Sequence, residues 1–176
     1  TVLAFARREL APIADEIDRT DAFPPDLFRR LGDLGVLGVT IPSEYGGAGA
    51  DLLSGVLIIE QLARVSASVA LSYGAHANLC VHNLYTNGTE EQRRAYLPGL
   101  CSGDLVGALA ITEPDAGSDA VGIRTTAVTD GDDFVLNGTK MFITNGTIAD
   151  VFVLYAKTSP ERGSNGITTF IVEKDF

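Results

Sequence analysis

Basic residues are scarce in this sequence. Its 176 residues include 13 Lys and Arg against 23 Asp and Glu, which gives a formal net charge of −10. The basic residues form no cluster, and the acidic excess is spread along the chain. Nucleic acids and anionic membranes bind proteins through clustered Lys and Arg that displace counterions. The composition therefore excludes both classes of partner.

Cysteine is also rare, with only Cys80 and Cys101. Two cysteines cannot build a disulfide framework, and they cannot complete a four-ligand zinc site without other residues. We interpret both as reduced thiols in a cytoplasm-like compartment. His76 lies four residues before Cys80 and could share a helix face with it, but two further ligands are missing. A packed helix is the better interpretation, and we expect no metal site.

Long apolar runs are absent. No stretch approaches the 18–20 apolar residues that cross a bilayer, and no charged-then-apolar signal segment opens the sequence. We therefore expect a soluble protein that does not use a membrane. The sequence begins at Thr1 rather than Met and ends at Phe176 inside a predicted strand, so we expect a longer chain.

The common nucleotide-binding motifs are missing too. No G-x-G-x-x-G follows a strand and no G-x-x-x-x-G-K-S/T occurs, so neither a Rossmann site nor a P-loop is encoded. The glycine-rich run from Gly46 to Gly49 follows Tyr45, and we favour a turn over a phosphate site there. No spacing supports a Ser/His/Asp or Cys/His catalytic set.

The first hundred residues predict helices. An apolar stripe with helical spacing covers Leu3 to Ile17, and Pro12 should kink or divide that helix. A second helix follows Pro24-Pro25, and Gly35 ends it.

Two further helices are predicted in this part. Leu52 to Val69 is apolar and long enough for a helix buried on most sides. Thr89 and Gln92 form a capping box, which places a short helix at about Glu90–Tyr96, ended by Pro98-Gly99.

The spacing of apolar residues changes near residue 104, from a helical period of about 3.6 to a strand period of 2. Asn137-Gly138 is typical of a type I′ turn and predicts a hairpin. The predicted strands are residues 105–112, 123–129, 134–136, 139–144, 150–158 and 167–173. No βαβ alternation is present. The fold class is therefore α+β, with an all-α helical domain over residues 1–103 and an antiparallel β domain over residues 104–176.

The residues that could bind a ligand lie at two predicted strand ends. Ala116-Gly117-Ser118 can bring backbone N–H groups close to a ligand, because little side chain stands in the way. Phe142 to Gly146 is a second strand end with an aromatic ring and hydroxyl groups. Together they would suit a flat heteroaromatic ligand, and two ordinary turns are an equally good interpretation. We interpret Glu113 as a hydrogen-bonding anchor rather than a general base.

The same residues carry a family resemblance. The run TEPDAGSD at 112–119, followed by NGTKMFITNG at 137–146, resembles the acyl-CoA dehydrogenase family, and the similarity covers the whole chain in order and spacing. LSYGAHANLC at 71–80 and YAKT at 155–158 resemble the isovaleryl-CoA dehydrogenase branch.

The resemblance implies a three-domain fold: a helical N-terminal domain, a middle antiparallel β-barrel and a C-terminal helical domain that this sequence lacks. FAD would lie between the last two domains. The residues implied at the flavin are Leu109, Ala110, Ile111, Thr112, Gly117, Ser118, Phe142, Ile143 and Thr144, with Thr144 close to flavin N5. Ser118, Ser164 and Asn165 would contact the CoA part of the substrate. Many family members have Trp where this chain has Phe142.

The implied activity is the FAD-dependent α,β-dehydrogenation of a short branched-chain acyl-CoA to the 2-enoyl-CoA. Electrons would pass to an electron-transfer flavoprotein, and the protein would be a homotetramer. It would lie in the cytoplasm of a bacterium or the mitochondrial matrix of a eukaryote. No residue of 1–176 matches the family's catalytic Glu, so we expect that base after Phe176 and assign no catalytic residue. The alternatives are an acyl-CoA oxidase or flavin-dependent monooxygenase of the same fold, and a non-catalytic relative.

Overall fold

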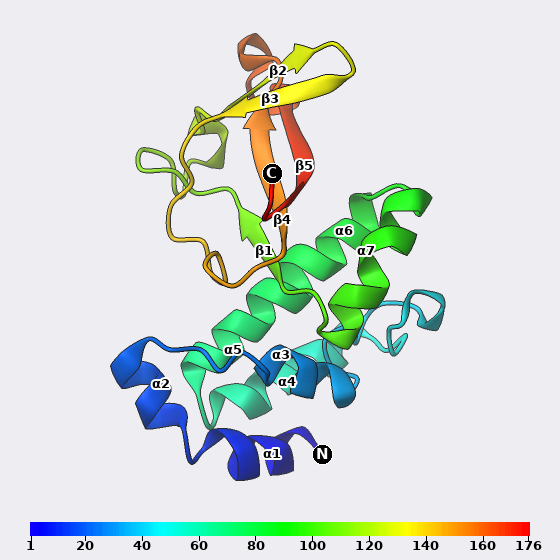
Figure 1. The fold of residues 1–176 in the computed structure, drawn as a ribbon, viewed down its shortest axis with the longest axis vertical. Helices are drawn as coiled ribbons and strands as arrows, with labels where there is room; N and C mark the ends of the chain where they lie inside the picture. Colours follow the sequence, from blue (N-terminus) through cyan, green and yellow to red (C-terminus); the bar gives the residue numbers. More distant parts are fainter. The chain divides into compact units, whose positions relative to one another are not determined.

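The computed structural model describes residues 1–176, which form two compact units, Thr1–Gly107 and Ala108–Phe176 (Figure 1). Unit 1 is helical and unit 2 carries the sheet. The helices of unit 1 are α1 (Val2–Phe5), η1 (Ala6–Leu10), α2 (Ala14–Thr20), α3 (Leu27–Asp33), η2 (Ser43–Tyr45), α4 (Leu52–Ala63), α5 (Ala67–Gly74), η3 (Ala75–His82), α6 (Asn83–Asn87) and α7 (Glu90–Ser102). None of these helices is both long and apolar enough to cross a membrane.

The first predicted helix is divided as expected. The helical run of α1 and η1 ends at Leu10, and α2 begins at Ala14, on either side of Pro12. Proline has no backbone N–H to continue the helical ladder. Gly35, at φ 70°, follows the end of α3, so that helix ends as predicted.

The apolar segment from Leu52 to Val69 is two helices, and the prediction of one is wrong. The side chain of Asp51 accepts a hydrogen bond from the Ser54 amide at 2.9 Å and caps α4. Ser66 then accepts from the Val69 amide at 3.3 Å and starts α5. Serine competes with the helix for backbone amides, so it favours a cap over a helix interior.

The expectation that α4 is buried on most sides is also wrong. Only one face of α4 joins the core, through Ile58 and Leu62. Four apolar side chains on α4 are largely exposed: Leu52, Leu53, Val56 and Leu57. The helix therefore buries one face only, although most of its residues are apolar.

The capping box at the start of α7 is confirmed. The Thr89 amide donates to the Gln92 side chain at 2.8 Å, and the Gln92 amide donates to the Thr89 hydroxyl at 3.2 Å. The predicted end at Pro98-Gly99 is wrong, because α7 continues to Ser102 and stops at Gly103 (φ 77°). Leu97 and Leu100 are fully buried on either side of Pro98, and this packing outweighs the missing hydrogen bond.

His76 is a packed core residue, as predicted. Its Nδ1 accepts a hydrogen bond from the Gly107 amide at 2.9 Å, so Nε2 carries the proton and donates to the Leu100 carbonyl at 3.0 Å. The ring is fully buried and packs against Phe28 at a tilt of 45°, with the centroids 5.0 Å apart. Burial lowers the pKa of His76 to about 4, although the hydrogen bond to Leu100 acts in the opposite direction. The imidazole is therefore neutral at physiological pH.

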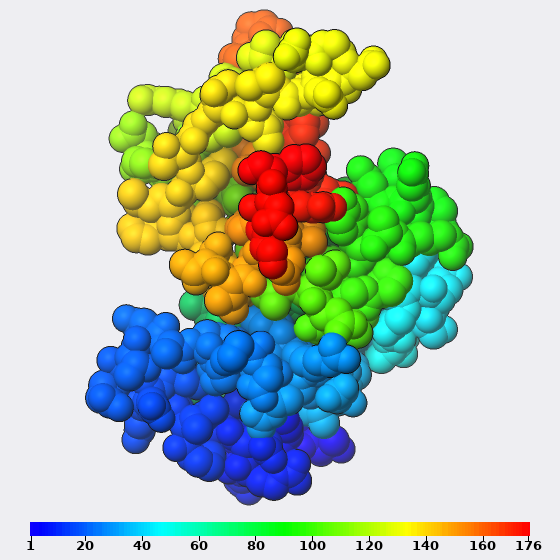
Figure 2. Space-filling view, viewed as in Figure 1, coloured from blue at the N-terminus to red at the C-terminus, as the bar shows by residue number.

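Unit 2 contains one five-stranded sheet. Its strands are β1 (Gly107–Ala110), β2 (Thr126–Asp130), β3 (Asp133–Asn137), β4 (Val151–Lys157) and β5 (Ile167–Glu173), with short 3₁₀ turns η4 (Ala120–Gly122) and η5 (Pro160–Gly166). The strand order is β1-β4-β2-β3, and β5 pairs with β4 along its whole length (Figure 1). The last residues of the chain lie at the surface, as Figure 2 shows in red.

The prediction of an antiparallel β-barrel is wrong in two respects. The β2–β3 and β4–β5 pairs are antiparallel, but β2 runs parallel to β4, so the sheet is mixed. The sheet is also open, because β3 is an end strand that pairs with β2 alone. Barrel closure requires the end strands to pair with each other, and here they do not.

The prediction of a purely antiparallel sheet assumed a hairpin at Asn137-Gly138, and that hairpin does not form. The observed hairpin joins β2 to β3 through Gly131 and Asp132, with Gly131 at φ 64°. Residues 139–144 form no strand and belong to a long connection that returns the chain beside β2. Gly138 serves close packing instead of a turn, since a Cβ there would lie 2.2 Å from the Thr125 Oγ1.

Candidate functional site

The two segments that the sequence predicted as strand ends lie side by side in unit 2, although only the first follows a strand. We call residues 109–119 the first loop and residues 137–146 the second loop. The Met141 amide donates to the Thr112 carbonyl at 2.8 Å. The Lys140 ammonium donates to the Ile111 carbonyl, also at 2.8 Å. A single edge of unit 2 therefore carries both loops, although 29 positions of sequence separate the two residues of each of these bonds.

Glu113 anchors the first loop. Its carboxylate accepts hydrogen bonds from the Arg124 amide at 2.6 Å, the Thr125 amide at 3.0 Å, the Thr125 hydroxyl and the Lys140 ammonium at 2.8 Å. Burial alone would raise the pKa of Glu113, but the hydrogen bonds from Lys140, Thr125 and the Arg124 amide lower it to about 2. A carboxylate this acidic and this fully bonded is a poor proton acceptor. Glu113 is therefore an anchor, as the sequence indicated, and not a general base.

The first loop exposes its backbone immediately after that anchor. Glu113 and Ala116 exchange two backbone hydrogen bonds, of 2.9 and 3.1 Å, and close a tight turn. Gly117 and Ser118 follow this turn and are exposed. A Cβ added to Gly117 would meet no atom within 4 Å, so the space in front of this backbone is open.

The second loop presents an aromatic ring from a strained backbone. Phe142 has φ 55° and is 86% exposed. A bulky residue in the left-handed region is a genuine outlier, and such outliers gather at functional sites. Ile143 and Thr144 are half-buried, and the Gly146 amide donates to the Ile143 carbonyl at 2.8 Å. The Phe142 ring is therefore exposed on a loop whose next two residues are half-buried.

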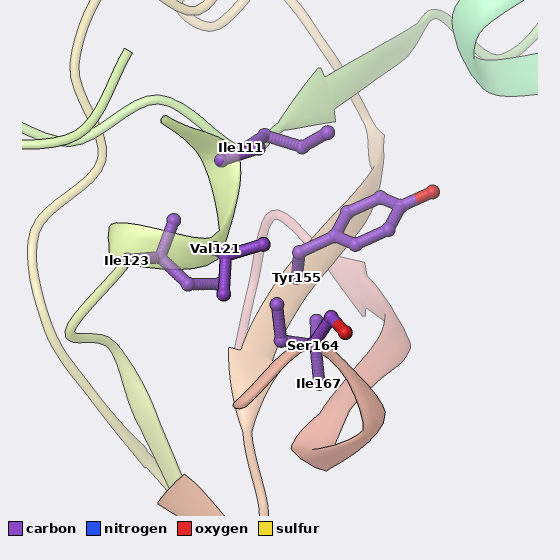
Figure 3. Close-up of a pocket in the computed structure, with 7 residues that line it drawn as sticks. Ile111, Val121, Ile123, Tyr155, Ser164 and Ile167 are labelled. Carbon is purple, nitrogen blue, oxygen red and sulfur yellow. The ribbon is translucent and has the colours of Figure 1, made fainter. Parts of the chain in front are cut away.

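A cavity of about 290 Å³ in unit 2 is lined by one predicted cofactor residue, Ile111, and one predicted substrate residue, Ser164 (Figure 3). Ile111 comes from the first loop, and Ser164 comes from η5. Their neighbours are apolar or aromatic: Ala120, Val121, Ile123, Tyr155 and Ile167. Figure 3 shows Tyr155 on β4 with its ring near Ile111.

The remaining predicted residues flank this arrangement. Leu109 and Ala110 lie in β1, where Ala110 is buried and Leu109 is half-buried. Asn165 is exposed beside Ser164 in η5. Ser118 is exposed in the first loop.

Sequence reasoning missed the side chains that connect these parts. Lys140 lies inside the run that resembles the family, and the sequence predicts only a positive charge there, not a contact between the two loops. Val121, Ile123 and Tyr155 line the cavity and were not selected. The periodicity of β4 could have indicated an inward Tyr155, whereas nothing local indicates that Lys140 reaches a residue 29 positions earlier.

The glycine-rich run of unit 1 is a turn and not a phosphate site, as predicted. Its amides all donate to backbone carbonyls: Gly46 to Ser43, Gly47 to Pro42, Ala48 to Gly38, Gly49 to Ile41 and Ala50 to Val39. An anion site needs backbone N–H groups that point at the ligand. These groups are already satisfied within the turn.

The donor set of unit 2 defines what the site can bind. The open backbone at Gly117, the hydroxyls of Thr112 and Thr144, and the exposed Phe142 ring combine polar edges with an apolar face. This combination fits a flat heteroaromatic ligand that carries hydrogen-bonding groups on its edge. The chain contains no group of three or more His, Cys, Asp or Glu residues placed to hold a metal ion.

Two family models match the chain: Acyl-CoA dehydrogenase, N-terminal domain, over residues 1–104, and Acyl-CoA dehydrogenase, middle domain, over residues 108–176. A curated relative, the mitochondrial isovaleryl-CoA dehydrogenase of Solanum tuberosum, is 50% identical over 176 residues, which is 99% of this chain and 43% of the relative.

Solved structures are also similar to this chain. One chain, from a structure described as the electron transferring flavoprotein of Acidaminococcus fermentans, is 42% identical with a TM-score of 0.95, covering 98% of this chain and 46% of that one. The glutaryl-CoA dehydrogenase of Mycobacterium smegmatis, in complex with FADH2, is 37% identical with a TM-score of 0.92, covering 99% of this chain and 44% of that one. This chain spans less than half the length of each. The chain, with a helical unit and a sheet unit that each match a family domain, belongs to the acyl-CoA dehydrogenase family.

Proposed function

We propose that this chain forms the N-terminal and middle parts of an FAD-dependent dehydrogenase that converts a short branched-chain acyl-CoA to the 2-enoyl-CoA. The observation that carries the proposal is the 2.8 Å hydrogen bond from the Met141 amide to the Thr112 carbonyl, which joins the two loops. The isovaleryl-CoA dehydrogenase relative supports the substrate class, and the FADH2 complex supports the cofactor.

The donor set of the two loops fits FAD. The Thr112 and Thr144 hydroxyls and the open backbone at Gly117 offer hydrogen bonds to the edge of a flavin ring, and Phe142 offers an apolar face. FAD, when bound, supplies a two-electron acceptor. The remaining flavin-facing residues in the proposal are Leu109, Ala110, Ile111, Ser118 and Ile143.

The cavity residues and the exposed hydroxyls would hold the substrate. Ser118, Ser164 and Asn165 would donate to the CoA part of the substrate. Ile111 and Tyr155 would exclude water from the cavity.

The base that removes the α proton must come from outside the site residues described. Glu113 is ion-paired to Lys140 and accepts three further hydrogen bonds. Its pKa of about 2 leaves it with little affinity for a proton. We therefore place the base in the part of the relatives' length that this chain does not span.

Electrons would leave through an electron-transfer flavoprotein. The similarity to a chain of the Acidaminococcus fermentans structure supports this class of acceptor. We further propose a homotetramer, and a mitochondrial matrix location if the source is eukaryotic or a cytoplasmic one if it is bacterial.

The test uses the full-length protein reconstituted with FAD under anaerobic conditions. Isovaleryl-CoA, butyryl-CoA and glutaryl-CoA are added separately, and bleaching of the visible flavin absorption is followed. We expect isovaleryl-CoA to bleach the flavin fastest. Bleaching by no acyl-CoA would contradict dehydrogenation. Reoxidation by oxygen faster than by an electron-transfer flavoprotein would indicate an oxidase or a monooxygenase.

A further inference from the structure

We propose that Lys140 is a positioning residue that holds the two loops in the register required for flavin binding. This inference rests on the proposed function. Lys140 does not need to touch the flavin, because its contacts are to the protein. Its ammonium donates to the Ile111 carbonyl and to the Glu113 carboxylate, each at 2.8 Å. Both acceptors belong to the first loop, whereas Lys140 belongs to the second.

The pair that Lys140 forms with Glu113 is unusual for this chain. The two side chains are 10% and 6% exposed, whereas the Lys174–Asp150 pair in the same unit is 56% and 21% exposed. Burying two charges costs desolvation energy that their attraction offsets only with good geometry and additional hydrogen bonds. Glu113 has those bonds from Thr125 and the Arg124 amide. A buried pair is weak evidence for stability, so a role in fixing geometry is the better account.

The strained residue of the second loop lies two positions after Lys140. Phe142 holds φ 55° with its ring 86% exposed, so packing of the ring does not maintain this backbone conformation. Strained conformations persist only where the surrounding structure over-determines them. The determinants just before Phe142 are the Lys140 contacts and the Met141 bond to Thr112. Loss of Lys140 would therefore allow the second loop to relax and move Phe142 and Thr144 relative to Thr112.

The experiment compares full-length wild-type protein with Lys140→Met and the matched control Lys174→Met. The dissociation constant of FAD is measured by flavin fluorescence, and the shape of the visible flavin absorption is recorded for the bound form. We expect Lys140→Met to weaken FAD binding by about tenfold or more, as loss of a charged hydrogen bond predicts. We also expect it to blunt the fine structure of the flavin band. The control should match wild type in both measurements.

A double variant separates positioning from stability. Lys140→Met alone leaves the buried Glu113 carboxylate unpaired, and adding Glu113→Gln removes that charge. We expect the double variant to regain thermal stability relative to Lys140→Met, while its FAD affinity stays low because the contact with the Ile111 carbonyl is still missing. Recovery of affinity together with stability would overturn the inference. If Lys140→Met does not fold, the double variant alone carries the test.

Failure of the inference differs from failure of the proposed function. Wild-type protein that binds no FAD would overturn both. Wild-type protein that binds FAD, with Lys140→Met binding it equally well and with the same spectrum, would overturn only the role of Lys140.

Discussion

The backbone amide of Met141 donates to the carbonyl oxygen of Thr112 at 2.8 Å. This bond joins two residues that lie 29 positions apart in the sequence. Together with the Lys140 contacts, this bond fixes the spacing between the first loop and the second loop. The proposed flavin site is therefore a product of tertiary structure, and neither loop would form it alone.

Alanine substitution at two glycines should affect different properties: FAD binding at Gly117 and stability at Gly138. Gly117→Ala meets open space and should leave the free energy of unfolding unchanged, yet weaken FAD binding because its Cβ obstructs the approach to the backbone. Gly138→Ala places a Cβ 2.2 Å from the Thr125 Oγ1 and should cost about 1–3 kcal/mol. Denaturant unfolding and FAD titration of both variants measure these effects. Equal effects of the two changes on stability would contradict the description of the loops.

Phe142 should contribute to binding and not to stability. Its ring is 86% exposed, and glycine accepts φ 55° without strain, so Phe142→Gly should change the free energy of unfolding by less than about 1 kcal/mol. FAD affinity should fall, because the apolar face is lost. Phe142→Trp, which keeps an aromatic ring, is the control and should retain affinity. A large loss of stability in Phe142→Gly with unchanged FAD affinity would show that the ring has a structural role instead.

His76 should make the stability of unit 1 depend on pH. In the unfolded chain its pKa is near the ordinary 6.5, whereas in the folded state burial lowers that pKa to about 4. Protonation therefore favours the unfolded state, so its contribution is complete above pH 6.5 and is lost as the pH falls toward 4. The shift corresponds to about 3 kcal/mol.

The variant His76→Phe tests this prediction. It leaves the Gly107 amide and the Leu100 carbonyl without their partner, so it should cost about 1–3 kcal/mol near neutral pH. Its stability should then vary less than that of wild type between pH 6.5 and 4. Urea unfolding across that range measures both. The same pH slope in the two proteins would contradict a buried neutral imidazole.

Local signals in the sequence predicted much of the fold. The capping box at Thr89 and the break at Pro12 depend on residues within one helical turn, and both predictions are confirmed. The strand predicted at 167–173 matches β5, because β-branched and aromatic residues, which favour strands, make up most of it. One error arose where a local signal was overridden by packing. Asn137-Gly138 favours a turn, but Gly138 packs against Thr125 and residues 139–144 form no second strand of a hairpin.

The site was less predictable than the fold. Thr112, Phe142 and Thr144 could be selected because strand ends with small or polar residues are typical binding positions. The contact between Lys140 and Ile111 depends on how the long connection before β4 returns across unit 2, and residue spacing carries no record of that path. The mixed sheet has the same origin, since β4 lies beside β2 instead of β3.

Backbone amide hydrogen exchange in the full-length protein, with and without FAD, tests whether the two loops form one flavin site. We expect FAD to slow exchange in two separate segments, residues 109–118 and 141–146, while exchange at the Gly46–Ala50 turn stays the same. Tight FAD binding with no added protection in either segment would contradict this expectation.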